Sequence, residues 1–187
     1  SAYLYDLTEQ ILDPSNSIHQ GNESPPPYLD EMPGLMDELH RQAGIAASWL
    51  HRQGYRGTAS VDFLLTRHDD GSFTAYVCEI NARVTGATYP SVLARHFHPL
   101  GSWRMRNLEL THPLPGDVLL DKLRSHSELF HPDRRSGILP LNFNLDPAGL
   151  VQKGQFLAIS EDLPSCRQLL ETTRHDLPVE WDYTRDR

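Results

Sequence analysis

The spacing of hydrophobic residues divides the first third of the chain into a strand, a loop and a helix. An alternating pattern predicts a strand over residues 2–12. Residues 13–33 are rich in Pro, Asn, Ser and Gly, including three consecutive prolines, and are therefore predicted to form a loop. Hydrophobic residues at helical spacing predict an amphipathic helix over residues 33–53, and Gly54 stands where a glycine commonly ends a helix.

The middle of the chain is typical of a β-hairpin. Two apolar runs predict strands over 58–66 and 72–81, and the Asp70-Gly71 pair between them is a strong turn signal. With a two-residue loop, Asp62 on the first strand stands directly opposite Glu79 on the second. With a four-residue loop, the two residues are diagonal neighbours. Either register places both carboxylates on the same face, because side chains alternate between the two faces of a strand.

The two faces of this hairpin differ in polarity. We expect the buried face to carry the apolar residues Val61, Phe63, Leu65, Tyr76, Cys78 and Ile80. On the other face, the carboxylates of Asp62 and Glu79 repel each other, which destabilises a sheet unless something compensates for the repulsion. A divalent cation compensates for it, because Mg²⁺ binds carboxylate and amide oxygens. Asn81 follows on the same face, and Arg83 does so if the strand stays extended. The alternative is that these polar side chains are simply solvated.

The second half of the chain is predicted to contain shorter elements. A short helix is expected over residues 89–97, and residues 101–115 are predicted to be irregular. We expect a boundary there, so that residues 1–105 form one domain and residues 106–187 form a small C-terminal subdomain. The elements expected in this subdomain are a helix over 117–129, strands over 137–144 and 154–160, and a helix over 163–174.

Composition narrows the class of protein. The 187 residues are 39% hydrophobic, which suits one globular domain with a small appendage. A net charge of −8 argues against a general nucleic-acid-binding role. No apolar run reaches the roughly 20 residues of a membrane helix, and no signal peptide opens the chain. Cys78 and Cys166 suggest neither a disulfide framework nor a CxxC metal site. We therefore expect a soluble, cytoplasmic protein.

The basic residues are strongly biased towards arginine. Of the 17 lysines and arginines, only Lys122 and Lys153 are lysines. Nucleotide-binding enzymes commonly offer lysine charges to phosphates, and both of these lysines lie late in the chain. Because the chain also opens directly on a strand-like run, we expect it to be a fragment of a longer protein. The preference for arginine fits a GC-rich bacterial genome.

The hairpin and the residues after it resemble a known family. The residues Val61-Asp62-Phe63, followed by Glu79-Ile80-Asn81-Ala82-Arg83-Val84-Thr85-Gly86, resemble the C-terminal lobe of ATP-grasp ligases. Within that family, the chain is most similar to peptide ligases of the pheganomycin type and their carboxylate–amine ligase relatives. The resemblance is specific over residues 55–95 and extends to residues 8–27. It implies an α+β fold: an ATP-grasp C-terminal lobe, made of an antiparallel sheet with packed helices, followed by a small α/β C-terminal subdomain.

The resemblance also implies an activity and its cofactors. ATP, with Mg²⁺ or Mn²⁺, would phosphorylate a substrate carboxylate, and an amine would then displace the phosphate to form an amide. The implied metal ligands are Asp62, Glu79 and Asn81. Asn81 and Arg83 would contact the nucleotide, and Arg83 would steady the transferring phosphoryl group. The residues that would contact the substrate are Thr85, Gly86 and His19. The family's nucleotide-binding lysines lie in an N-terminal lobe. We therefore expect that lobe to belong to the same polypeptide, and this chain alone to be inactive.

One position departs from the family pattern, and one alternative stays open. Some ATP-grasp ligases carry a substrate-binding arginine two residues before the first acidic metal ligand, where this chain has Ser60, although Arg56 is nearby. The alternative function is a catalytically silent module of ATP-grasp type that binds a ligand or a partner. The intact Asp62, Glu79, Asn81 and Arg83 favour the enzyme.

Other polar clusters are interpreted as structural. Histidines at 96, 98, 112, 126 and 131 lack the spacing of a metal site and are expected to be scattered over the surface. Arg104 and Arg106 are expected on a surface segment, and Arg134-Arg135 in an exposed turn. The apolar residues 138–141 and 166–170 are expected in the core. No serine lies in a GxSxG motif, so a serine hydrolase is unsupported.

Overall fold

A computed structural model describes the whole chain except residues 1, 14, 16–17, 178 and 181–187. The described chain forms two compact units. The first comprises Ser1–Leu7 and Pro26–Tyr89, and the second comprises Thr8–Pro25 and Pro90–Arg187. The division predicted after residue 105, which falls within a strand of the second unit, stays a prediction.

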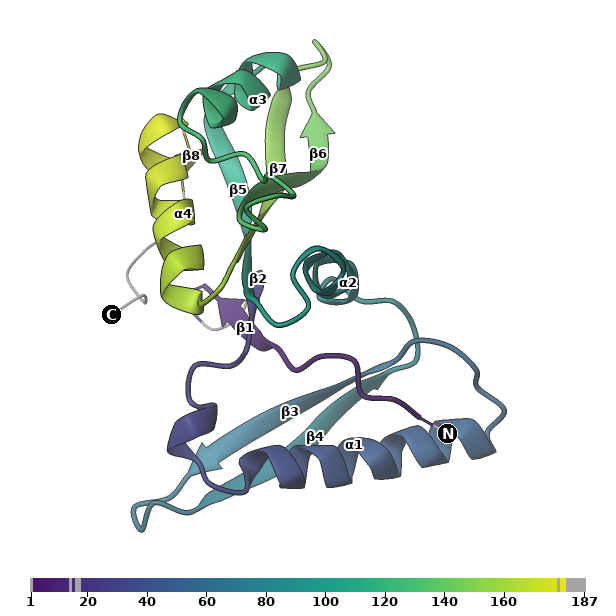
Figure 1. Cartoon of the computed structure of the whole chain (residues 1–187). Coiled ribbons are helices and arrows are strands. Elements are labelled where there is room, and N and C mark those ends of the chain that lie inside the picture. Colours follow the sequence, from purple (N-terminus) through teal and green to yellow (C-terminus); the bar gives the residue numbers. More distant parts are fainter. Residues whose placement is uncertain (1, 14, 16–17, 178, 181–187) are drawn as a thin grey trace. The chain divides into compact units, whose positions relative to one another are not determined.

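The first unit is a helix packed against a two-stranded hairpin. Helix α1 (Leu35–Arg52) runs along β3 (Ser60–Arg67) and β4 (Phe73–Asn81), and a short 3₁₀ helix, η1 (Leu29–Glu31), precedes it (Figure 1). The buried residues of this core are Leu35, Leu39 and Ala75, with Leu7, Tyr28, Leu29, Met32, Phe63, Leu65 and Phe73 packed around them. The predicted helix and both predicted strands are therefore present to within about two residues at each end.

The end of α1 follows from its sequence. Gly54 adopts the left-handed conformation with φ of 88°, its N–H donates to His51 O at 3.1 Å, and the Tyr55 N–H donates to Leu50 O at 3.0 Å. This is the Schellman arrangement that satisfies the last carbonyls of a helix. The Arg56 guanidinium adds hydrogen bonds to His51 O at 3.0 Å and to Tyr55 O at 2.8 Å. The side chain of Arg56 thus caps the helix.

The hairpin follows neither of the two predicted registers along its whole length. Near the turn, Phe63 pairs with Val77 and Leu65 pairs with Ala75, whereas beyond a β-bulge Asp62 pairs with Glu79. The bulge inserts one extra residue into β4. It therefore shifts the alternation, and between the turn and the bulge the predicted buried face of this strand is wrong, whereas beyond the bulge Ile80 pairs with Val61 as predicted. Phe73 and Ala75 contribute to the core, while Tyr76, Cys78 and Ile80 are exposed.

The second unit is built on an antiparallel sheet with the strand order β1-β2-β5-β7-β6, and β8 pairs with β5. Its helices include α3 and α4, which lie along one face of this sheet (Figure 1). The strands are β1 (Glu9–Leu12), β2 (His19–Ser24), β5 (Ser102–Leu114), β6 (Gly137–Leu145), β7 (Val151–Ser160) and β8 (Val179–Glu180), and the helices are α2 (Thr88–Phe97, which begins in the first unit), α3 (Gly116–Ser125) and α4 (Leu163–Asp176).

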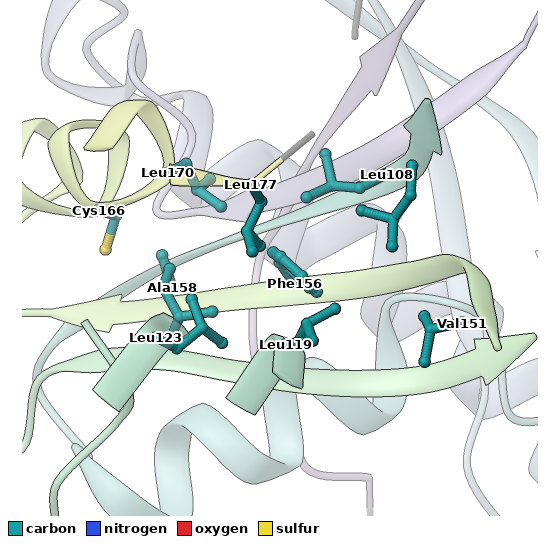
Figure 2. Packing of buried hydrophobic residues seen from close by; sticks show 11 residues of the cluster. Leu108, Leu119, Leu123, Val151, Phe156, Ala158, Cys166, Leu170 and Leu177 are labelled. Atoms are coloured by element: carbon teal, nitrogen blue, oxygen red, sulfur yellow. The ribbon is translucent and has the colours of Figure 1, made fainter. Parts of the chain in front are cut away.

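The core of the second unit lies between this sheet and the two helices (Figure 2). Leu108 on β5 and Phe156 on β7 meet Leu119 and Leu123 of α3 and Leu170 of α4. Helix α4 starts at an N-cap aspartate, Asp162, whose carboxylate accepts the Ser165 N–H at 2.8 Å. The predicted core residues Ile138, Cys166 and Leu170 are buried, and Arg134-Arg135 are exposed as predicted.

Two segments predicted to lack regular structure are strands. The predicted loop contains β2, which pairs with β1 and β5, and the predicted irregular segment is β5. The N-terminal strand is shorter than predicted and begins at Glu9. Close packing fixes β2 against β5: a Cβ at Gly21 would lie 1.9 Å from Met105 O, so only glycine fits. No described helix is long and apolar enough to span a bilayer.

Candidate active site

Two carboxylates face each other at one end of the β3–β4 hairpin. Asp62 on β3 is directly opposite Glu79 on β4, and the Cβ atoms of such a pair lie about 4.5–5.5 Å apart. Glu79 is exposed and Asp62 is half-buried. The two side chains lie on the face opposite the α1 core, which they share with the exposed Leu64 and Tyr76.

Asn81 completes this group from the end of β4. Its Nδ2 donates to Asp62 Oδ2 at 3.4 Å, and the residue is only 8% exposed. Because the nitrogen makes this hydrogen bond, the amide oxygen is the atom that Asn81 can offer to a cation. Asp62, Glu79 and Asn81 therefore lie together, on neighbouring positions of one sheet face.

The chemistry of these three side chains fits a hard divalent cation. Mg²⁺ takes oxygen ligands from one or two carboxylates and keeps several waters, and two carboxylates with one amide supply such a set. Among the described residues, no group of three or more His, Cys, Asp and Glu side chains is placed to hold a metal. A cation here would therefore depend on the amide oxygen and on waters or phosphate oxygens as well as on the two acids.

The segment after β4 carries the other predicted groups of this unit. The Arg83 side chain is exposed, and its Nη1 donates to Val84 O at 3.3 Å. Thr85 accepts a hydrogen bond from the Thr88 N–H at 3.1 Å, and its own N–H donates to Thr88 Oγ1 at 3.0 Å. These two hydrogen bonds close a turn directly before α2. A Cβ at Gly86 would meet no described atom within 4 Å, so packing within the described chain does not require glycine there.

His19 belongs to the second unit. It lies at the start of β2, where its Nε2 is 2.8 Å from Asn22 Oδ1, and its carbonyl accepts a hydrogen bond from Asn107 Nδ2 at 3.1 Å. The structure therefore places His19 in the β2–β5 sheet and the candidate metal ligands in the β3–β4 hairpin, in different units of the chain.

Comparison with known proteins supports the fold. No protein-family model and no curated protein sequence matches the chain. Among solved structures, the chain is similar to a biotin carboxylase from Campylobacter jejuni in complex with β,γ-ATP, with a TM-score of 0.55 and 15% sequence identity over 92% of this chain. Biotin carboxylase is an ATP-grasp enzyme. The predicted fold class is confirmed. This chain spans 42% of the length of that biotin carboxylase chain.

Sequence reasoning missed a buried ion-pair network in the second unit. Arg104, predicted on the surface, is 3% exposed and forms an ion pair with Glu23, which is also 3% exposed. The second carboxylate oxygen of Glu23 accepts from Arg167 of α4 at 3.1 Å. Arg106, also predicted on the surface, is buried. The alternation of Trp103, Arg104, Met105 and Arg106 was the available signal for a strand.

Glu128 is a second buried acid that the sequence did not single out. It is 3% exposed; its Oε2 accepts a hydrogen bond from Thr173 Oγ1 at 3.2 Å, while its Oε1 has no hydrogen-bond partner among the described residues. Asp176, which pairs with His126 at 3.3 Å, is close enough to repel it. Burial, reinforced by Asp176, raises the pKa of the Glu128 carboxyl, although the Thr173 hydrogen bond opposes this shift.

Glu128 should therefore make stability fall as pH rises. A carboxyl whose pKa is higher in the folded chain stabilises the fold most below its unfolded pKa, and this contribution is lost as pH rises through the folded pKa. Glu128→Gln should remove this dependence and raise the free energy of unfolding at pH 8 by about 1–3 kcal/mol. Urea unfolding at pH 5 and pH 8 measures the effect, with the exposed Glu161→Gln as control. Equal pH dependence in wild type and Glu128→Gln would contradict the prediction.

Proposed function

We propose that this chain is the metal-binding and substrate-binding part of an ATP-dependent carboxylate–amine ligase. The observation that carries the proposal is the direct opposition of Asp62 and Glu79, with Asn81 beside them. Two opposed carboxylates destabilise a sheet, and a divalent cation bridging them to nucleotide phosphates gives a reason for their presence. The ATP-grasp type of fold supports the same class of reaction.

In this proposal each side chain has a separate task. Asp62, Glu79 and Asn81 would hold Mg²⁺ or Mn²⁺, which supplies charge neutralisation to the phosphoryl oxygens when bound. The Arg83 guanidinium is exposed in the segment that follows β4, two residues beyond Asn81, so it can pair with oxygens of the transferring phosphoryl group. Thr85, Gly86 and His19 would contact the substrate.

The proposed reaction has two steps. A substrate carboxylate oxygen attacks the γ-phosphorus of ATP, so that an acyl phosphate forms and ADP leaves. The amine then attacks the acyl carbon, inorganic phosphate leaves, and the amine proton passes to solvent or to a base. Positioning and electrostatic stabilisation of the phosphoryl oxygens supply most of the catalysis in such transfers.

The longer protein is also part of the proposal. The nucleotide-binding lobe would come from an N-terminal part of the same polypeptide, so this chain alone would not turn over. Within the ATP-grasp ligases, we assign it to the pheganomycin-type group, which joins amino acids or peptides, because the resemblance covers residues 8–27 and 55–95. A reaction that consumes ATP fits a cytoplasmic protein, and the preference for arginine over lysine fits a bacterial origin.

Product analysis of the full-length protein tests the proposed function. ADP should form only when a carboxylate and an amine are both present with ATP and Mg²⁺, and one amide should form for each ADP released. Amino acids and dipeptides, each tested as either partner, form the first substrate panel. With hydroxylamine as the amine, the product should be a hydroxamate, because hydroxylamine traps an acyl phosphate.

Two outcomes would contradict this function. ADP release that needs neither a carboxylate nor an amine would indicate a simple ATPase. Binding of substrates without any ADP formation would favour the alternative, a catalytically silent module that serves as a binding domain.

A further inference from the structure

A bulge in β2 brings an exposed histidine and a buried asparagine onto the same face of this strand. Ile11 on β1 pairs with Gly21, and the next residue, Leu12, pairs with His19, so β2 carries one extra residue at this point. An extra residue shifts the alternation of side chains by one position. His19 and Asn22 are three residues apart and would otherwise point to opposite faces. Here the two side chains meet, and His19 Nε2 lies 2.8 Å from Asn22 Oδ1.

The orientation of the Asn22 amide is fixed by its surroundings. Its Nδ2 donates to the carbonyl of Glu9 on β1 at 3.5 Å, and the residue is only 2% exposed. Turning the amide by half a turn would place its oxygen against the carbonyl oxygen of Glu9, where neither atom can donate. Oδ1 therefore faces His19. Because a carbonyl oxygen only accepts hydrogen bonds, Nε2 is the ring nitrogen of His19 that carries a proton.

The main chain of His19 is held as well as its ring. The His19 carbonyl accepts from Asn107 Nδ2 on β5 at 3.1 Å, and Asn107 Oδ1 accepts from Gln155 Nε2 on β7 at 2.8 Å. The side chain is nevertheless exposed, and within the described part of the chain the hydrogen bond to Asn22 is the only one that its ring makes. A neutral imidazole with its proton on Nε2 offers Nδ1 as an acceptor. His19 therefore presents an oriented acceptor nitrogen at the surface of the second unit.

We propose that Asn22 is a positioning residue that holds His19 as the Nε2–H tautomer, so that Nδ1 accepts a hydrogen bond from the amine substrate. The inference rests on the proposed function, in which His19 contacts a substrate. An amine has N–H groups to donate, whereas a carboxylate has only oxygens that accept. Of the two substrates, the amine is therefore the one that matches Nδ1.

The same nitrogen can serve as the base for the amine. An ammonium group must lose a proton before its nitrogen attacks the acyl carbon. Nδ1 of His19 can take this proton, which converts the ring to an imidazolium, and the imidazolium then returns the proton to solvent.

The ¹⁵N resonances of the His19 ring in the 187-residue chain test the role of Asn22. Protonated and unprotonated ring nitrogens differ widely in ¹⁵N shift, so ¹H–¹⁵N correlation spectra of the neutral ring identify the tautomer, and His19→Gln assigns the signals. The wild type should show one tautomer, with the proton on Nε2. Asn22→Leu keeps a similar shape without an acceptor and should show a mixture of tautomers. Asn107→Leu is the matched control and should keep one tautomer, because Asn107 binds the carbonyl of His19 and not its ring.

Titration of the same chain with two small probes tests the ligand. Glycinamide offers an amine without a carboxylate, and N-acetylglycine offers a carboxylate without an amine. Glycinamide should move the Nδ1 resonance of His19, and N-acetylglycine should leave it unchanged. Asn22→Leu should bind glycinamide about 3–10-fold more weakly, because the acceptor of this hydrogen bond is no longer fixed in place.

Several results would overturn the inference. They are a wild-type ring with its proton on Nδ1 or shared between both nitrogens, a single Nε2–H tautomer retained in Asn22→Leu, and a Nδ1 resonance that moves with N-acetylglycine or with neither probe. If Asn22→Leu does not fold, the wild-type tautomer and the two titrations decide. These measurements need neither ATP nor metal nor turnover. Their failure is therefore distinct from failure of the proposed function, which the assay of amide and ADP formation decides.

Discussion

If the proposed function holds, replacing Glu79 by glutamine in the full-length protein should lower kcat by a factor of about 10²–10³, which is about 3–4 kcal/mol of transition-state stabilisation. The substitution keeps the size of the side chain but removes one of the two charges that face each other across β3 and β4. The remaining Asp62 and Asn81 would hold a divalent cation weakly. The cation would then be bound in a smaller fraction of the molecules, and the charge on the phosphoryl oxygens would be neutralised less often. Initial rates of ADP formation, at saturating ATP and at increasing Mg²⁺, measure the effect.

A matched variant of the same hairpin serves as control. Asp69 lies in the turn at the other end of β3 and β4 and is exposed. Asp69→Asn removes the same charge from the same unit without changing Asp62, Glu79 or Asn81, and it should leave kcat unchanged. Partial recovery of Glu79→Gln at high Mg²⁺ would support a role in metal binding. Wild-type turnover in Glu79→Gln would contradict the assignment of Glu79 as a ligand.

The hairpin illustrates what local sequence can and cannot predict. The Asp-Gly pair and the apolar runs predicted both strands, and the opposition of Asp62 and Glu79 was one of the two registers considered. The two-residue turn assumed for that register was nevertheless wrong. The strands leave the turn in a register shifted by one residue, and a bulge in β4 restores the pairing of Asp62 with Glu79. A bulge changes the period of one strand only. The alternation of apolar and polar residues gives no sign of where the bulge lies.

The second unit was harder to predict because its polar residues are buried. Arg104 and Arg106 made residues 101–115 look like an irregular surface segment, yet β5 is the buried central strand of the sheet. Their burial depends in part on Glu23, which is 81 residues away from its partner Arg104. The glycine and the polar residues of β2 likewise suggested a loop, whereas Gly21 permits close pairing with β5. Such long-range compensation cannot be inferred from periodicity.

The candidate metal site was easier to predict than its surroundings for a simple reason. Asp62, Glu79 and Asn81 lie on adjacent strands that are neighbours in sequence, so both registers considered placed them near one another on one face. The bulge in β4 then restores the direct pairing of Asp62 with Glu79. Thr85 forms hydrogen bonds with Thr88 in the turn before α2, a local structural role that the motif alone did not indicate.

Replacing Glu23 by glutamine should reduce the free energy of unfolding of the second unit by about 3–5 kcal/mol. The Glu23 carboxylate joins β2 to β5 through Arg104 and to α4 through Arg167. Glutamine keeps the shape of the side chain but removes the negative charge, so the buried Arg104 guanidinium loses its compensation by this carboxylate. Breaking a buried pair in this way is far more costly than removing an exposed one, because the remaining charge stays out of water.

Urea unfolding followed by the fluorescence of Trp103, which is fully buried in the second unit, measures this loss. The background carries Trp49→Phe and Trp181→Phe, so that Trp103 alone reports. Arg167→Gln is the matched control: it breaks the other ion pair of the same carboxylate, and because the Arg167 side chain is 45% exposed, it should cost at most about 1 kcal/mol. The prediction is contradicted if Glu23→Gln and Arg167→Gln lower the free energy of unfolding equally, with unchanged m-values. Burial of the Glu23–Arg104 pair would then not determine how much the pair contributes to stability.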